Sequence, residues 1–296
     1  MRNGIELLLR HLATERGLST NYQLSTRHSL ECFSAWLKKA TGTEAAADVR
    51  PEQLTQYLAD RKSQGLAAAS LKLEVVALRI FFRFLVGRAY IPEDPAQFLV
   101  IPKIERYLPE TLNLSAMEQL LESVNETSPL GLRNRAMLEL LYACGLRVSE
   151  LCSLRLENLD LDAQFVRVTG KGDKTRLVPL GSKSKTALIQ YLHSGRPQLV
   201  TAKTKAEVFL STRGKKLTPQ RPWQLIKQYA ARLGMDANVY PHLFRHSFAT
   251  HLLVNGADLR IIQELLGHAD ISTTQIYTQL DQTRLHTVHR KFHPRA

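Results

Sequence analysis

The chain has 296 residues, of which 44% are hydrophobic and 23% are charged, and this balance excludes an intrinsically disordered protein. Its net charge of +13 favours a polyanionic partner, nucleic acid first, over an acidic membrane surface, because no basic amphipathic segment with a bulky apolar face stands out. The sequence has no stretch of about 18 apolar residues that could span a membrane, and the N-terminal run IELLL is too short for a signal peptide core, so we expect a cytoplasmic protein.

The first third of the sequence predicts helices only. The segment LSTNYQLSTRHSLECFSAWLKKA is a long amphipathic pattern with Ser19 or Thr20 as its N-cap. A second helix has Pro51 in its first turn and Gly65 as its stop. The heavily apolar segment 70–87 predicts the central helix of a bundle.

Four prolines then interrupt regular structure and predict an extended linker. They are Pro92, Pro95, Pro102 and Pro109. We therefore expect one domain over residues 1–107 and a second over 108–296. The first has 15 Lys and Arg against 11 Asp and Glu, and the second has 25 against 16, so both could contact nucleic acid.

The second part predicts a mainly helical domain with a small β-sheet. Ser115 and Glu118 form a capping box ahead of one helix, and LRNRAMLELLYAC predicts another that Gly145 ends. FVRVTG and TRLVPL alternate as strands do, and KGDK joins them, which predicts a β-hairpin. From LTPQRPWQLIKQYAARLG onward the pattern is helical again.

Three cysteines, Cys32, Cys144 and Cys152, are scattered along the chain. Their odd number and spacing predict neither a disulfide framework nor a zinc site. We expect buried thiols in a reducing cytoplasm.

Two cations occupy unusual places. Arg147, in GLRVSEL, follows an apolar helix at its junction with the next, where a charge is costly to bury unless an anion meets it. It could also simply cap a carbonyl or pair with Glu150. Lys171 lies at the predicted hairpin tip between Gly170 and Gly172, where it could reach a ligand or simply be solvated.

The segment YPHLFRHSFATHLL places His242 and Arg245 on one face of a helix, because they are three residues apart. We expect the buried face to consist of Phe244, Phe248, Leu252 and Leu253. A metal site at His242 and His246 is a weaker alternative, because no glutamate lies between them as in zinc proteases.

The segment IIQELLGHADISTTQIYT carries the last candidates. Gly267 predicts a helix C-cap, and His268 follows it directly. Ser272 then caps a new helix that bears Tyr277, whose alternative role is a core or interface tyrosine.

Taken together, two arginines, a lysine, two histidines and a tyrosine in a basic chain match the needs of phosphodiester chemistry. Arginine binds two phosphate oxygens at once, lysine and histidine transfer protons, and tyrosine supplies an oxygen nucleophile.

At these segments the sequence resembles the tyrosine site-specific recombinases, also called the phage-integrase family, and its Xer subgroup in particular. The resemblance covers nearly the whole chain, and the terminal FHPRA is typical of one Xer type. The family hallmark is Arg, Lys, His-x-x-Arg, His or Trp, and Tyr in that order. Its matches here are Arg147, Lys171, His242, Arg245, His268 and Tyr277.

The resemblance implies a two-domain clamp, with a SAM-like helical core-binding domain at 1–107 and a catalytic domain at 108–296. It also implies that Arg147 and Arg245 bind the scissile phosphate while Tyr277 attacks it to form a 3′-phosphotyrosyl link.

In the same resemblance Lys171 is the acid for the leaving 5′ oxygen, His242 a proton shuttle and His268 a phosphate ligand. Cationic side chains then replace a metal ion, and the covalent link conserves the bond energy, so we expect no metal, ATP or other cofactor.

The implied partner is double-stranded DNA carrying a specific recombination site, for resolving chromosome dimers during segregation. The resemblance implies a tetramer on paired sites with a second related recombinase, a possible septal DNA translocase, and a C-terminal tail docked on a neighbouring subunit. A DNA-binding protein without turnover, a mobile-element integrase and a relaxing topoisomerase are the alternatives.

Overall fold

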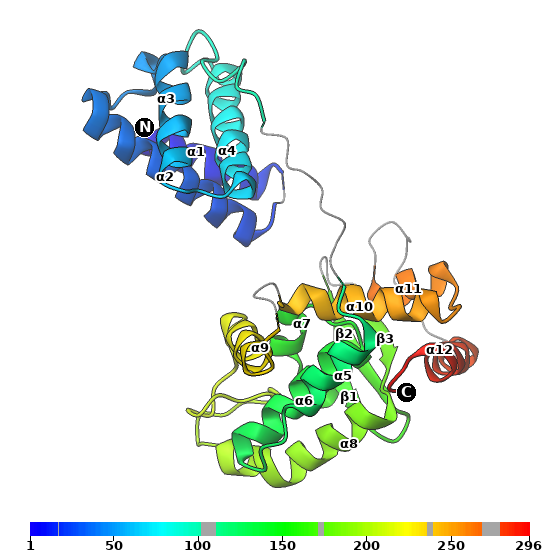
Figure 1. Ribbon diagram of the computed structural model, residues 1–296. Coiled ribbons are helices and arrows are strands. Elements are labelled where there is room, and N and C mark those ends of the chain that lie inside the picture. The colour runs from blue at the N-terminus through cyan, green and yellow to red at the C-terminus, as the bar shows by residue number, and fades with distance from the viewer. Residues whose placement is uncertain (17, 102–110, 171–174, 236–238, 268–278) are drawn as a thin grey trace. The chain divides into compact units, whose positions relative to one another are not determined.

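The computed structural model describes residues 1–16, 18–101, 111–170, 175–235, 239–267 and 279–296. The chain divides into two compact units, Met1–Tyr107 and Leu108–Ala296 (Figure 1). Each unit has its own hydrophobic core, so each is described by itself.

The first unit is an all-helical bundle. Its helices are α1 (Arg2–Thr14), α2 (Thr20–Thr41), α3 (Pro51–Ser63) and α4 (Ala68–Gly87), with a 3-10 turn at Ala46–Asp48. The apolar helix α4 contacts the other three, as expected of a central helix, and so does α2 (Figure 1). Phe82 of α4 packs edge-on against Phe33 of α2, with ring centroids 6.3 Å apart, so aromatic rings fill the middle of the bundle.

The helix boundaries of this unit follow from local chemistry. The Ser19 hydroxyl accepts a hydrogen bond from the Tyr22 N–H at 3.4 Å and caps α2. Pro51 opens α3, where its missing N–H costs nothing, and Gly65 follows with a φ of +81° that favours glycine. The predicted caps are thereby confirmed.

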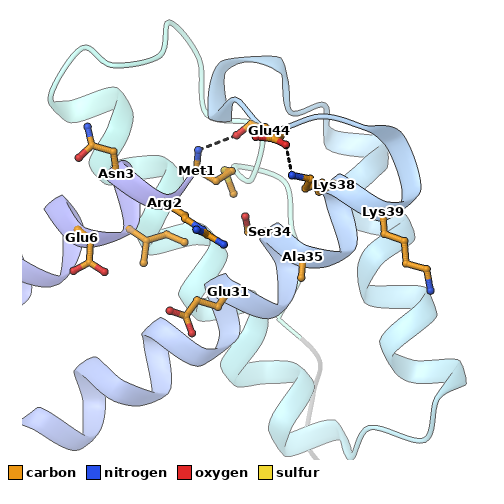
Figure 2. Close-up of a pocket in the computed structure, with 11 residues that line it drawn as sticks. Met1, Arg2, Asn3, Glu6, Glu31, Ser34, Ala35, Lys38, Lys39 and Glu44 are labelled. Carbon is orange, nitrogen blue, oxygen red and sulfur yellow. Dashed lines mark hydrogen bonds and ion pairs between the residues drawn. The ribbon is translucent and has the colours of Figure 1, made fainter.

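A hollow of about 1140 Å³ lies beside the start of α1 and the face of α2, and Figure 2 shows the side chains that line it. The Met1 ammonium donates to the Glu44 carbonyl oxygen at 2.8 Å, and Lys38 pairs with the Glu44 carboxylate at 2.5 Å. Its lining mixes both signs of charge and includes none of the candidate catalytic residues.

The second unit packs its helices and a small sheet around one long buried helix. The helices are α5 (Leu114–Glu122), α6 (Pro129–Ala143), α7 (Val148–Ser153), α8 (Ser182–Gln190), α9 (Gln220–Arg232), α10 (Pro241–Val254), α11 (Leu259–Leu266) and α12 (Gln279–Phe292). A π-helical turn at Tyr191–Gly195 and 3-10 turns at Leu156–Asn158 and Arg196–Leu199 complete them. Helix α6 contacts α5, α7, α8, α9 and α10, so it forms the centre of the core (Figure 1).

The sheet has three antiparallel strands in the order β1 (Leu159–Asp160), β2 (Phe165–Thr169) and β3 (Thr175–Pro179). Thr169 pairs with Thr175, which confirms the two predicted strands, while the tip 171–174 lies outside the described residues. Strand β1 was not predicted, because two residues are too few to show alternation. The predicted fold class, mainly helical with a small sheet, is confirmed.

Two local predictions in this unit are wrong. Helix α5 is capped by Asn113, whose side-chain oxygen accepts the Ala116 N–H at 2.8 Å, so Ser115 lies inside the helix and forms no capping box with Glu118. Leu253 is 51% exposed, because the buried stripe of α10 recurs every four residues and excludes its neighbour.

The C-terminal tail packs on its own unit in this structure. Arg295 binds Glu139 of α6 through two hydrogen bonds of 3.0 and 2.7 Å, and both side chains are buried. The His289 ring donates to the Ala143 carbonyl oxygen at 2.8 Å. The expected docking on a neighbouring subunit stays a prediction.

Candidate active site

The turn that carries Arg147 is built around a glycine. Gly145 ends α6 with a φ of +55°, and a Cβ on it would lie 2.6 Å from Cδ1 of Phe248. Only glycine fits there, and α6 ends at Ala143, two positions before this glycine. Arg147 then becomes the N-cap of α7.

Arg147 meets a carboxylate in its own turn. Its backbone N–H donates to Oε2 of Glu150 at 2.8 Å, and its Nη1 donates to Oε1 at 2.7 Å. The pairing with Glu150 that the sequence left open is therefore present. The Arg147 side chain nevertheless keeps 37% of its surface exposed, so a ligand can still reach the guanidinium.

Glu150 is shared with a second arginine that comes from the sheet. Arg176 of β3 donates to both carboxylate oxygens, at 3.0 and 2.9 Å, and both side chains are buried. Burial alone would raise the pKa of Glu150, but the ion pairs with Arg176 and Arg147 hold that pKa below its ordinary value. Glu150 is thus ionised, and Arg176 neutralises its charge.

Helix α10 brings the second predicted arginine to the same place. Arg245 donates from Nη1 to the Gly145 carbonyl oxygen at 2.8 Å and from Nη2 to that of Leu266 at 2.6 Å. Burial first, and then the positive charges of Arg147 and Arg176, lower its pKa to about 10. The fold therefore gathers Arg147 and Arg245, and Arg245 stays cationic at neutral pH.

His242 lies one turn before Arg245 on α10 and is exposed. The spacing of three residues puts both side chains on one face of the helix, as predicted. The His242 imidazole is therefore open to solvent on the face of α10 that carries Arg245.

Three predicted residues, Lys171, His268 and Tyr277, lie outside the described residues, as does the predicted cap Ser272. Their nearest described neighbours can be placed. Gly267 ends α11 with a φ of +66°, which confirms the predicted C-cap directly before His268.

Arg176 is the residue that the sequence interpretation missed. A signal for it exists, because Arg176 and Val178 alternate on the buried face of β3, where a charged side chain is unusual. Such a residue needs a buried partner, and only the fold reveals that the partner is Glu150.

Cys144 and Cys152 are buried in this unit and make no contact with the arginines or Glu150 among the described hydrogen bonds. Burial raises the pKa of the Cys144 thiol to about 12 and that of Cys152 to about 11. Both thiols stay protonated at neutral pH, while Cys32 is only half-buried.

The charges at the site do not balance. Arg147, Arg176 and Arg245 face a single carboxylate, Glu150, so two positive charges are in surplus. A surplus of cations that includes the partly exposed Arg147 is suited to a phosphate group, whose charge increases as it is attacked. Within the described ranges there is no group of three or more His, Cys, Asp or Glu side chains that could hold a metal ion. Nor is any helix in those ranges long and apolar enough to cross a membrane.

Comparison with known families identifies both units. The model of the phage integrase N-terminal SAM-like domain matches residues 5–89, and that of the phage integrase family matches residues 110–284. The chain belongs to the phage integrase family. The recombinase resemblance seen in the sequence is thereby confirmed.

Relatives within the phage integrase family are similar over their whole length. Tyrosine recombinase XerD of Listeria monocytogenes serotype 4b (strain F2365) is 43% identical over 297 residues, which cover 100% of each chain. Tyrosine recombinase XerD of Proteus mirabilis is 45% identical and covers 99% of this chain and 93% of its own. This member of the family is therefore a tyrosine recombinase that performs site-specific DNA recombination, and its predicted likeness to the Xer subgroup is confirmed.

A solved integrase shares the fold. The lambda integrase (75–356) dimer bound to a COC′ core site superimposes with a TM-score of 0.72 over 94% of this chain and 99% of that one. Its sequence is 18% identical, so this similarity bears on the fold alone.

Proposed function

We propose that this recombinase cuts and rejoins DNA at one specific chromosomal site through a 3′-phosphotyrosyl intermediate, and that its task is to resolve chromosome dimers. The observation that carries the proposal is that Arg147 and Arg245, 98 positions apart in the sequence, lie close together in the fold. Arg245 also binds the carbonyl of Leu266, which lies two residues before His268. The full-length identity to XerD proteins supports the task.

In the proposed reaction Arg147 and Arg245 bind the two non-bridging oxygens of the scissile phosphate. Their surplus positive charge offsets the charge of the pentacoordinate transition state. The phenol oxygen of Tyr277 attacks phosphorus, and the bond to the 5′ oxygen breaks. A free phenol has a pKa of about 10, so the neighbouring cations also help it to ionise.

The remaining groups move protons or hold the phosphate. Lys171 protonates the leaving 5′ oxygen, and His242 relays the phenol proton from its exposed position. His268 hydrogen-bonds a phosphate oxygen. Attack by the 5′ hydroxyl of a partner strand on the phosphotyrosine then reverses these steps, releases Tyr277 and reseals the backbone.

The partner is double-stranded DNA, and the 1–107 unit is the core-binding domain while the 108–296 unit is catalytic. We propose a tetramer on paired sites that contains a second related recombinase, with a septal DNA translocase as activator. The lambda integrase of the same fold is solved as a dimer on its core site, which is a multimeric DNA complex of the proposed kind. The reaction belongs in the cytoplasm, where the chromosome lies.

A covalent-adduct assay tests this function. Adducts captured on genomic DNA of the source organism give the site, and a nicked duplex of that site is then incubated with the protein in EDTA. A protein–DNA adduct should form, persist after denaturation and vanish in Tyr277→Phe. The matched control is Tyr90→Phe, which removes an exposed hydroxyl from the other unit and should leave the adduct unchanged.

Adduct that survives Tyr277→Phe would refute the nucleophile. Binding without any adduct would favour a DNA-binding protein that lacks turnover. Relaxation of supercoiled DNA of arbitrary sequence would favour a topoisomerase instead.

A further inference from the structure

One buried guanidinium connects three segments of the catalytic unit. Arg176 uses Nη1 and Nη2 on Glu150 and Nε on the Leu265 carbonyl oxygen, at 3.0, 2.9 and 2.8 Å. The residue is 5% exposed. Since each nitrogen already has a protein acceptor, Arg176 is not available to bind DNA.

The first segment is the turn of Arg147. Glu150 bonds the Arg147 backbone and side chain with the same two oxygens that Arg176 holds. The Arg147 guanidinium therefore has its position set by a carboxylate that Arg176 in turn fixes.

The second segment is the end of α11. Arg176 binds the Leu265 carbonyl, Arg245 binds that of Leu266, and a Cβ on Gly267 would lie 2.9 Å from Cδ of Arg176. The backbone thus passes directly over the Arg176 side chain just before His268. The third segment is β3 itself, which follows the hairpin of Lys171 and pairs Arg176 with Val168.

We infer that Arg176 is a positioning residue for recombination. It aligns three segments around one phosphate: the turn of Arg147, the end of α11 just before His268, and strand β3, which follows Lys171. The inference rests on the proposed function. Its physical basis is the charge of Glu150. With Arg176 in place the carboxylate is neutralised, and Arg147 keeps its charge for the phosphate. Without Arg176 the buried carboxylate keeps Arg147 as its hydrogen-bonded cation and draws that charge away from the phosphate.

The test uses the full-length protein and the nicked site, and measures both DNA affinity and the rate of adduct formation. Arg176→Gln should slow adduct formation by about 100-fold, as expected for displaced catalytic groups, with DNA affinity nearly unchanged. The double variant Arg176→Gln, Glu150→Gln should form adduct at least about tenfold faster than Arg176→Gln alone, because it has no carboxylate to capture Arg147. A scissile methylphosphonate, which carries no charge, should likewise reduce the defect.

Arg133→Gln is the matched control. Arg133 is also buried in this unit, but it binds the Leu210 carbonyl and Asn134. Arg133→Gln should lower stability. Any loss in its rate of adduct formation should not be restored by Glu150→Gln or by the methylphosphonate. If Arg176→Gln does not fold, Arg176→Lys replaces it, since lysine keeps the charge but cannot bind three acceptors in a fixed fork.

Two results would overturn the inference while the proposed function stands: an unchanged adduct rate in the Arg176 variant, or a loss that neither Glu150→Gln nor the neutral phosphate reduces. A parent protein that binds its site and forms no adduct would overturn both the proposed function and the inference.

Discussion

Arg176 binds Glu150 end-on in the interior of the catalytic unit, with hydrogen bonds of 3.0 and 2.9 Å from Nη1 and Nη2 to its two oxygens. A buried ion pair of this kind adds little net stability over an apolar pair, but removing one partner leaves the other charge uncompensated. The pair therefore makes the geometry of the site costly to disturb.

Substitution of Glu150 tests this cost directly. Glu150→Ala strands the buried Arg176 and should lower the free energy of unfolding by about 3–5 kcal/mol in urea titration. The exposed pair of Glu157 and Arg155 provides the control, and Glu157→Ala should cost less than about 1 kcal/mol. Equal losses in the two variants would contradict the buried pairing.

Arg245 is expected to need its full guanidinium fork. Arg245→Lys cannot reach the Gly145 and Leu266 carbonyls while also presenting two donors to phosphate, so adduct formation should fall by about 100-fold. The folded pKa of about 10 keeps the parent arginine charged at pH 8. A rate measured on the nicked site that stays within about threefold of the parent rate would argue against bidentate binding.

The turn before Arg147 should tolerate glycine alone. Gly145→Ala combines a φ of +55° with a Cβ placed 2.6 Å from Phe248, and should cost about 2–4 kcal/mol of unfolding free energy. Gly42 has a φ of +70° with open space around it, so Gly42→Ala isolates the backbone component at about 1–2 kcal/mol. Chemical denaturation of both variants checks the difference, and a smaller loss at Gly145 would count against the close contact.

The docked tail should make the catalytic unit sensitive to acid. Burial lowers the pKa of His289 from 6.5 to about 4 and also lowers that of His293, whose ring stacks on it at 4.6 Å. Because the folded protein keeps His289 neutral and the unfolded chain protonates it near pH 6.5, unfolding takes up a proton below that pH. Stability is thus present above pH 6.5 and lost toward pH 4, by about 2 kcal/mol between pH 7 and pH 5 for His289.

Urea unfolding at the two pH values measures this slope. His289→Gln, which keeps a donor for the Ala143 carbonyl but cannot titrate, should show a smaller loss of stability on acidification. An unchanged slope in that variant would show that His289 is protonated in the folded state.

The corrected cap of α5 yields a matched pair of substitutions. Asn113→Ala removes the acceptor of the Ala116 N–H and should cost about 1 kcal/mol, whereas Ser115→Ala should change stability by less than about 0.5 kcal/mol. Denaturant midpoints separate the two. The reverse order would restore the capping box that the sequence suggested.

Local signals in the sequence were enough for much of the fold. The Ser19 cap, the Pro51 start and the alternation in β2 and β3 depend on residues within a few positions of one another, and the structure confirms each. At α5 two competent caps lie two residues apart, and only the packed helix shows that Asn113 is the one used.

The candidate site divides in the same way. The ordered motifs marked Arg147 and Arg245, and the structure brings them together. The part played by Arg176 depends on Glu150, 26 positions earlier, and on Leu265, 89 positions later, so no short-range pattern could reveal it. The contacts of the C-terminal tail were also beyond prediction, because its sequence does not indicate whether it packs on its own unit or on another subunit.

The buried ion pair of Arg295 and Glu139 has a consequence for how the proposed tetramer would assemble. A tail that is to reach a neighbouring subunit must first leave this position. Departure breaks two hydrogen bonds of 3.0 and 2.7 Å and leaves the Glu139 carboxylate with Arg135 as its ion-pair partner. In the proposed tetramer, exchange of tails between subunits would begin with the loss of this buried ion pair, so we expect the exchange to be slower than DNA binding.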